Sequence, residues 1–134
     1  LNMSLEKITK NLQGLKAKYG VFAVLGNHDN EFPEINVRTE FEKIGIKVLE
    51  NEIIPVQIKG EIISIFGVKD ILQLGGNWNQ ASQELKNTVE SSSISNSNII
   101  VLSHNPDTIV YMTEELLISN NLALFLAGHT HGGQ

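Results

Sequence analysis

Three short apolar segments, each followed within a few residues by histidine, constrain the fold of this chain more than any other feature. They read VFAVLGNHD, NIIVLSHNPD and LALFLAGHTH, and they carry all four histidines, His28, His104, His129 and His131. Such segments are typical of buried strands, and loops at the carboxyl ends of parallel strands form the binding crevice of α/β sheets. We expect Gly26 and Gly128 to supply the permissive backbone of tight strand-to-loop turns. Three strands that run the same way would therefore bring the histidines to one sheet edge.

The remaining segments predict helices and one hairpin. Apolar residues at steps of three and four indicate amphipathic helices, and a β-rich stretch broken at Lys59-Gly60 indicates a hairpin. The expected helices are 5–19, 34–44, 81–89 and one whose first position is Pro106; the expected strands are 21–25, 53–58, 61–67, 99–102 and 122–127; the expected loops are 69–80 and 91–98. This order predicts an α/β or α+β layered fold with a mixed sheet.

Size and composition fit one globular domain over residues 1–134. The chain is 41% hydrophobic and 19% charged, which is enough to bury a single core. Its apolar stretches are far shorter than the roughly 20 residues that a membrane-spanning helix needs. The opening LNMSLEKITK has the pattern of an amphipathic helix rather than of a targeting segment. We expect no part of this chain to span a bilayer.

Charge and cysteine content narrow the chemistry. The chain has no cysteine, so a metal ion here needs imidazole, carboxylate or amide ligands. Its formal net charge of -5 argues against a nucleic-acid partner held by a basic surface, because phosphate-backbone affinity comes from clustered lysine and arginine. A nuclease is therefore disfavoured, and salt-dependent DNA binding would be its signature.

The histidine loops contain the residue types of a site with two metal ions. In an extended segment, His129 and His131 point to the same side, two strand rises of about 3.3 Å apart. They could then serve one cation each of a pair about 3.5–4 Å apart. Asn27 offers an amide oxygen, although asparagine is also common in turns because it tolerates left-handed backbone. Asp29 offers a carboxylate that could orient an imidazole.

These loops resemble sequence blocks of a known family. The segments Gly26-Asn27-His28-Asp29, Ser103-His104 and Gly128-His129-Thr130-His131 are similar, in order and spacing, to the last three blocks of calcineurin-like metallophosphoesterases. The longer forms SHNPD and GHTHGGQ look most like the subgroup of bacterial membrane- or cell-wall-associated phosphoesterases typified by the YkuE-like proteins. The resemblance covers the chain from about Leu15 to Gln134. It implies part of a four-layer αββα sandwich.

The resemblance also implies a role for each residue of the blocks. One divalent cation of a pair would be held by Asn27, His104 and His129, and the other by His131. His28 would stabilise the transition state and assist the leaving group, with Asp29 holding it in orientation. The implied reaction is hydrolysis of a phosphomonoester, phosphodiester or pyrophosphate bond by a metal-activated hydroxide. Mn, Fe, Zn or Co suit these ligands, and the sequence does not choose among them.

The family's first two blocks, Asp-x-His and Gly-Asp-x-x-Asp, have no match in residues 1–25. In the family they supply most ligands of one cation and the bridging carboxylate. We therefore expect the C-terminal portion of the family's domain, truncated at both ends, which binds at most one divalent ion and does not turn over phosphoesters alone. The alternative is a catalytically silent scaffold or metal-binding interaction module of the same fold. The subgroup suggests membrane or cell-wall association in a bacterium through a preceding region; a cytoplasmic location and the oligomeric state stay open.

Other polar or aromatic residues have simpler interpretations. Asn105-Pro106-Asp107 fits a helix start better than chemistry. Asp70 fits a solvated loop, although the family often has an acidic residue near the site at this place. Trp78 either lines a substrate groove or covers an apolar edge, and the sequence does not decide between them.

Overall fold

Two sheets form the framework of the chain in the computed structural model, which describes residues 3–31, 36–92, 97–110, 112 and 120–131. The smaller sheet pairs β1 (Val21–Ala23) with β2 (Ile46–Val48) in parallel. The larger sheet contains β3 (Glu52–Ile58), β4 (Glu61–Gly67), β5 (Asn98–Ser103) and β6 (Leu122–Ala127), in that order. Strand β3 is antiparallel to β4, whereas β4, β5 and β6 are parallel, so the sheet is mixed as predicted.

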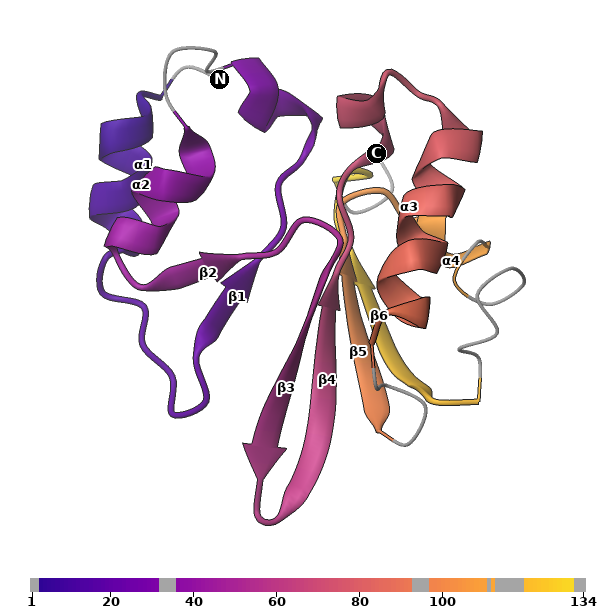
Figure 1. Cartoon of the computed structure of the whole chain (residues 1–134). Helices are drawn as coiled ribbons and strands as arrows, with labels where there is room; N and C mark the ends of the chain where they lie inside the picture. The colour runs from indigo at the N-terminus through magenta and orange to yellow at the C-terminus, as the bar shows by residue number, and fades with distance from the viewer. Residues whose placement is uncertain (1–2, 32–35, 93–96, 111, 113–119, 132–134) are drawn as a thin grey trace.

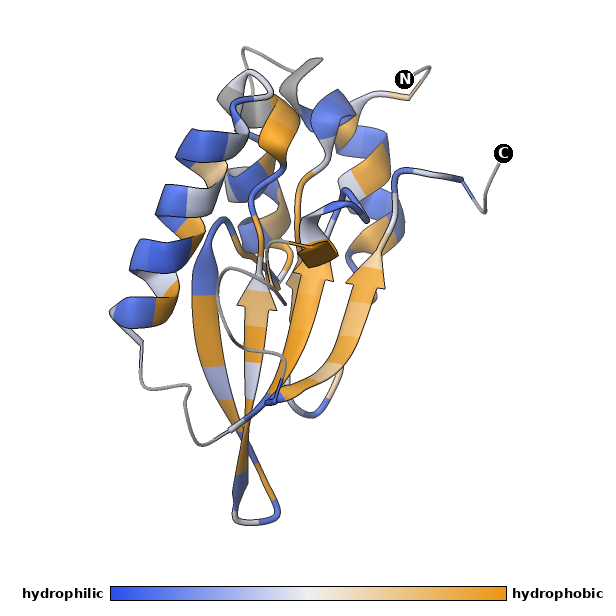
Figure 2. Cartoon of the chain, turned by 90° about the vertical axis from the view of Figure 1, so that its right-hand side faces the viewer, coloured by the Kyte–Doolittle hydropathy of each residue, from blue (hydrophilic) through white to orange (hydrophobic). Residues whose placement is uncertain are grey.

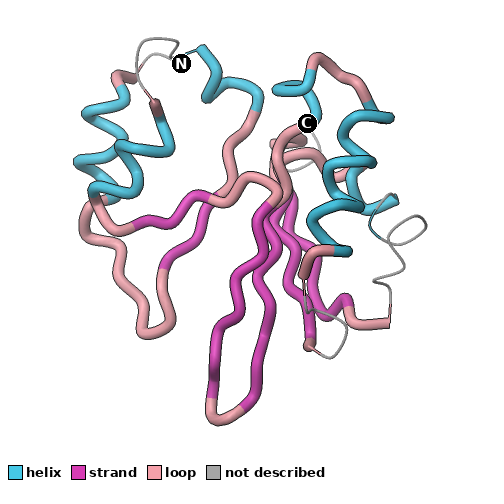
Figure 3. Tube along the Cα trace, in the orientation of Figure 1, coloured by secondary structure: helices cyan, strands magenta, loops and turns pink. Residues whose placement is uncertain are grey.

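Helices flank the strands on both outer sides (Figures 1 and 3). On one side lie α1 and α2, and on the other α3 and α4. Their bounds are α1 (Leu5–Leu12), α2 (Val37–Lys43), α3 (Trp78–Glu90) and α4 (Thr108–Val110), and two 3-10 helices are η1 (Asn27–Glu31) and η2 (Ile71–Leu74). The described elements therefore give a mixed α/β fold that agrees with the expected layers of an αββα sandwich.

The first helix is shorter than its apolar pattern predicts. Ser4 caps α1 by accepting a hydrogen bond from the Lys7 backbone, and the helix ends before Gly14. Leu15 and Tyr19, which continue the pattern, are 49% and 39% exposed. The prediction of a helix to residue 19 is wrong because a helix gains little from apolar residues that it cannot bury, and glycine weakens it further.

The hairpin and α3 agree with their predicted positions, but the stretch 69–80 is not only a loop. It contains η2 and the start of α3, where the Asn77 side chain accepts a hydrogen bond from the backbone of Gln80 (3.1 Å). That capping contact fixes the helix start earlier than the first apolar residue, Ala81, suggests. The last helix starts at Thr108, two residues after Pro106. Part of the predicted helix 34–44 and half of the predicted loop 91–98 lie outside the described residues.

Two clusters of apolar side chains form the core. The first 50 residues contribute one cluster beneath α1 and α2, built on Leu5, Leu25, Val37 and Val48. The larger sheet, α3 and the segments that follow β4 and α4 contribute the other, built on Phe66, Val68, Leu85, Ile99, Val101 and Met112. Figure 2 shows the apolar strands of the larger sheet beside helices whose outer faces are hydrophilic. None of the described helices has the length and apolar character needed to cross a bilayer.

Candidate metal centre

Adjacent strand ends bring two of the predicted ligands together. Strands β5 and β6 are parallel, with Ser103 paired to Ala127 in the last row, so His104 and His129 follow side by side. The backbone N–H of Gly128 donates to the His104 carbonyl (3.1 Å) and ties the two loops. The prediction that three parallel strands deliver the histidines to one sheet edge is confirmed for β5 and β6. It is wrong for β1, which precedes His28 and pairs with β2 in the smaller sheet.

Three side-chain atoms from separate loops meet at this edge. The Asn27 Oδ1 atom, in η1, lies 2.8 Å from Nε2 of His104. The same Nε2 atom lies 3.0 Å from Nδ1 of His129. The two imidazole rings meet edge to face, with centroids 4.9 Å apart and planes at 76°. The structure therefore places together the three residues that the resemblance assigns to one cation.

The separations of these atoms fit ligands of one divalent ion. Nitrogen and oxygen ligands lie about 2.0–2.2 Å from zinc, so two of them at right angles are about 3.0 Å apart. The observed 2.8 and 3.0 Å distances agree with that geometry. A single proton on His104 Nε2 can serve only one of its two close neighbours well. A cation relieves that conflict, and the donor set suits it.

Gly26 provides the space into which the His104 ring fits. A Cβ atom at position 26 would lie 2.7 Å from Cε1 and Nδ1 of the ring and 2.9 Å from Nε2. Gly26 does not have positive φ, and neither does Gly128. The expected need for permissive backbone is therefore wrong at both positions, and at Gly26 the requirement is room for the imidazole.

His129 and His131 do not lie on an extended segment. Their φ angles are +63° and +47°, and the backbone N–H of Thr130 donates to the Gly128 carbonyl (2.7 Å). The predicted extended geometry is therefore wrong, because a tight turn follows β6 at once. Left-handed backbone is uncommon for residues other than glycine and tends to be kept at functional sites.

The other predicted site residues lie around this set. His28 is exposed in η1, and the Asp29 carboxylate accepts a hydrogen bond from the Gly26 backbone (2.6 Å). His131 is exposed and takes no part in the contacts between Asn27 and the two other imidazoles. The roles of His28, Asp29 and His131 stay predictions.

Asp70 is a residue of this region whose environment the sequence interpretation missed. It is only 2% exposed, so the assignment to a solvated loop is wrong. Burial raises the pKa of Asp70, while the nearby His104 and His129 lower it. Asp70 follows β4, which is parallel to β5 and next to it. The strand-end rule that identifies the histidines would have found Asp70 had it been applied to β4.

Burial also lowers the pKa of His104, and Asp70 opposes that shift. His129 and His28 lower this pKa further, and Asp29 raises it. The net direction favours the neutral imidazole, which has the lone pair that a metal ligand requires.

Among the described residues, no three histidine, cysteine, aspartate or glutamate side chains are grouped as metal ligands. The meeting atoms are two imidazoles and one amide, so a cation here would need further ligands such as water. The three meeting residues therefore make one partial site.

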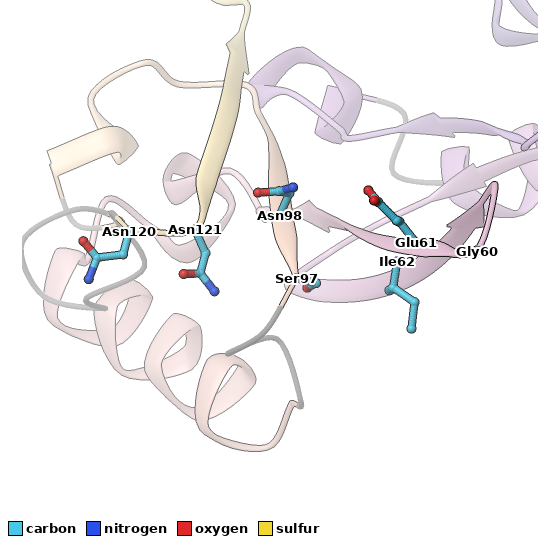
Figure 4. A pocket seen from close by; sticks show the side chains of 7 residues that line it. All are labelled: Gly60, Glu61, Ile62, Ser97, Asn98, Asn120 and Asn121. Atoms are coloured by element: carbon cyan, nitrogen blue, oxygen red, sulfur yellow. The ribbon is translucent and has the colours of Figure 1, made fainter.

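A separate hollow lies at the opposite edge of the larger sheet. Its volume is about 530 Å³, and its lining comes from the amino ends of β4 and β5 and the residues before β6 (Figure 4). The lining residues are Gly60, Glu61, Ile62, Ser97, Asn98, Asn120 and Asn121. None of the predicted ligands reaches this hollow, so we assign the chemistry to the carboxyl ends of the strands. Trp78 borders a much smaller internal space beside Ala81 and Leu85 and so covers apolar side chains.

The fold and the three strand-end loops agree with the family to which comparison assigns the sequence. The chain belongs to the calcineurin-like phosphoesterase family, whose model matches residues 3–133. This membership supports a phosphoesterase type of function and the use of divalent metals, which is typical of the family.

Relatives from animals and bacteria match most of the chain. F40B5.2 of Caenorhabditis elegans, which has metallophosphoesterase in its name, is 31% identical over 92% of this chain and 26% of its own length. The uncharacterized Bacillus subtilis protein YpbG is 32% identical over 96% of this chain and 45% of its own length. YkoQ of the same bacterium, named as an uncharacterized metallophosphoesterase, is 30% identical over 92% and 42%. The chain thus spans less than half the length of these relatives, and no solved structure matches it.

Proposed function

We propose that this chain provides one half of a binuclear phosphoesterase site, which hydrolyses phosphomonoester, phosphodiester or pyrophosphate bonds. The observation that carries the proposal is the meeting of Asn27, His104 and His129 within 3.0 Å contacts at one sheet edge. These residues would hold one divalent cation. His131, on the same turn as His129, would contribute to the second.

The bound ions would supply Lewis-acid polarisation of the phosphoryl oxygens and lower the pKa of bound water. The residues of the chain perform the remaining tasks. The contact between Asn27 and His104 joins the η1 loop to the end of β5, and this would bring His28, the next residue, near the same edge. A histidine there can donate a proton to the leaving oxygen. Asp29, anchored by the Gly26 backbone, holds the start of η1 in shape.

The carboxylates that the sequence lacks limit what the chain can do alone. The Asp-x-His and Gly-Asp-x-x-Asp patterns do not occur in the sequence, so carboxylates that bridge two cations have to come from elsewhere. We infer that these 134 residues bind one divalent ion weakly and do not turn over phosphoesters without those groups. Mn and Zn are suitable probes, because both accept imidazole and oxygen ligands.

Calorimetric titration of the chain with Mn²⁺ and Zn²⁺ tests the proposal. We expect saturable binding of one ion, which the His104→Ala variant abolishes. His131→Ala is the matched control, because it also removes an exposed imidazole but leaves the meeting atoms in place. Absence of binding, or binding that survives His104→Ala, would refute the half-site.

A phosphatase assay completes the test. Chromogenic phosphate monoesters and diesters should show no metal-dependent turnover with the chain alone. Rapid turnover would refute the inference that carboxylates from elsewhere are required. Binding of one ion without turnover, even after the two missing patterns are supplied on a longer chain, would favour the scaffold over the enzyme.

A further inference from the structure

Asp70 is an ionisable side chain that the proposed site does not use, and it is buried at an unfavourable place. Its exposed fraction is 2%, and neither carboxylate oxygen accepts a hydrogen bond of good geometry from a described residue. The backbone N–H groups of Ile71 and Leu72 lie near enough to favour the charged form, but they do not complete such bonds. Its side chain does not cap η2 either. Buried carboxylates are almost always paired, so this one needs an explanation.

The position of Asp70 provides one. Strands β4, β5 and β6 are adjacent and parallel, and their carboxyl ends lie at the same edge. Asp70 lies three residues after the end of β4, His104 lies one residue after β5, and His129 lies two residues after β6. Helix η2, which starts directly after Asp70, packs against η1, which contains Asn27. Asp70 therefore follows the same sheet edge as His104 and His129, and the helix that starts after it contacts the helix that contains Asn27.

The neighbouring charges point the same way. Among the neighbouring ionisable groups, Asp70 has the largest effect on the pKa of His104, and His104 and His129 are the ionisable groups that lower the pKa of Asp70. Two neutral imidazoles and an amide bring no negative charge to a cation. A buried carboxylate next to them does, and water screens it little.

We propose that Asp70 is the counter-charge of the metal centre: a buried carboxylate that raises the affinity of the His104–His129 pair for a divalent cation without ligating it. The proposal rests on the cation site described under the proposed function. Asp70 acts on the ion through space and through the orientation of His104, because the described residues contain no cluster of three such groups arranged as ligands. Groups that support metal ligands in this way typically change metal affinity about 10–100-fold when removed.

The test uses the full chain and measures two quantities, the melting temperature without metal and the affinity for Mn²⁺. If Asp70 had only a structural role, its replacement would lower both. The Asp70→Asn variant keeps the size of the side chain and removes its charge. When both proteins are freed of metal with a chelator, Asp70→Asn should melt at a higher temperature than the wild type. Calorimetric titration with Mn²⁺ should give an affinity about 10–100-fold lower than that of the wild type. Higher stability with weaker metal binding is the signature of a counter-charge.

Two further variants make the result decisive. Asp107→Asn removes an exposed carboxylate from the loop that follows His104, and it should bind Mn²⁺ like the wild type. Asp70→Glu keeps the charge and should restore most of the affinity that Asp70→Asn loses. Unchanged affinity in Asp70→Asn, or equal loss in Asp70→Asn and Asp70→Glu, overturns the proposal. Failure of the wild type itself to bind Mn²⁺ overturns the cation site and this proposal with it, which distinguishes the two failures.

Discussion

Gly26 gives the sharpest test of how the candidate site is built. An alanine there would place Cβ 2.7 Å from two atoms of the His104 ring, about 0.7 Å closer than the shortest ordinary contact. Those atoms belong to an aromatic ring that already contacts Asn27 and His129. The ring has to move, because the backbone around position 26 is fixed by the Asp29 carboxylate.

The size of the effect follows from that displacement. Metal sites keep their ligand distances within about 0.2 Å, so a ring shifted by about 0.7 Å no longer places Nε2 correctly. Overpacking of this kind costs about 1–3 kcal/mol. If the cost falls on the metal-competent arrangement, Mn²⁺ affinity decreases by about 5- to 150-fold.

Gly128→Ala is the matched control. It is the same substitution beside the same histidine, but its Cβ would lie 3.7 Å from His104 Nδ1, an ordinary contact. We expect calorimetric titration to show a large loss of Mn²⁺ affinity in Gly26→Ala and little change in Gly128→Ala. Equal affinities in the two variants would show that the His104 ring adapts freely. They would refute the claim that the ring needs the space left by Gly26.

The remaining predictions concern stability. Gly67→Ala should lower the free energy of unfolding, measured by urea denaturation, by about 1–3 kcal/mol. The reason is that the new Cβ would lie 2.1 Å from Cβ of the fully buried Leu49. A variant as stable as the wild type would contradict this packing. The second prediction concerns the pH dependence of stability that Asp70 causes. Because the pKa of Asp70 is raised in the folded state, its contribution to stability is present below the unfolded pKa, about 3.9, and is lost as the pH rises through the folded pKa. Metal-free wild type should therefore lose stability with rising pH relative to Asp70→Asn, and at about pH 7 the variant should be about 1–3 kcal/mol more stable. His104 and His129 oppose the rise in the pKa of Asp70. Parallel pH profiles of the two proteins in thermal unfolding would refute the assignment. Asn51 has a φ angle of +55°, accepts a hydrogen bond from the Lys69 backbone (2.9 Å) and donates one to Glu84 (3.0 Å). Asn51→Ala should therefore lower the free energy of unfolding by about 1–3 kcal/mol, and Asn51→Gly should lower it less. A larger loss in Asn51→Gly than in Asn51→Ala would exclude backbone strain at this position.

Sequence periodicity was sufficient for the larger sheet. Apolar runs of five or six residues bounded by glycine or polar residues define β6, and the Lys59-Gly60 turn defines the hairpin. These features are local, since a turn residue or a run of apolar side chains acts on its own backbone. The meeting of His104 and His129 followed from one further step, the parallel order of the strands.

The site details depend on contacts that no local pattern contains. Gly26 is needed because a ring 78 positions later occupies its side-chain space. The turn at His129 and His131 contains the hydrogen bond from the Thr130 N–H to the Gly128 carbonyl, and Gly128 itself donates to the distant His104. Spacing alone suggested an extended segment. Asp70 was assigned to solvent because aspartate is usually exposed. Its burial depends on how the segments around it fold together, which no local pattern predicts.

The candidate site lies between the parts of the chain that carry the two apolar clusters. Asn27 belongs to the half of the chain packed around Leu5 and Val48, and His104 and His129 belong to the half packed around Phe66 and Val101. A cation held by all three would clasp two separately packed halves, in addition to the ion pair between Arg38 and Glu52. At a free concentration one hundred times its dissociation constant, such a clasp adds about 2.7 kcal/mol to the folded state. The ion would then add to the contacts that already join the two halves, among them Leu49 packed against Gly67.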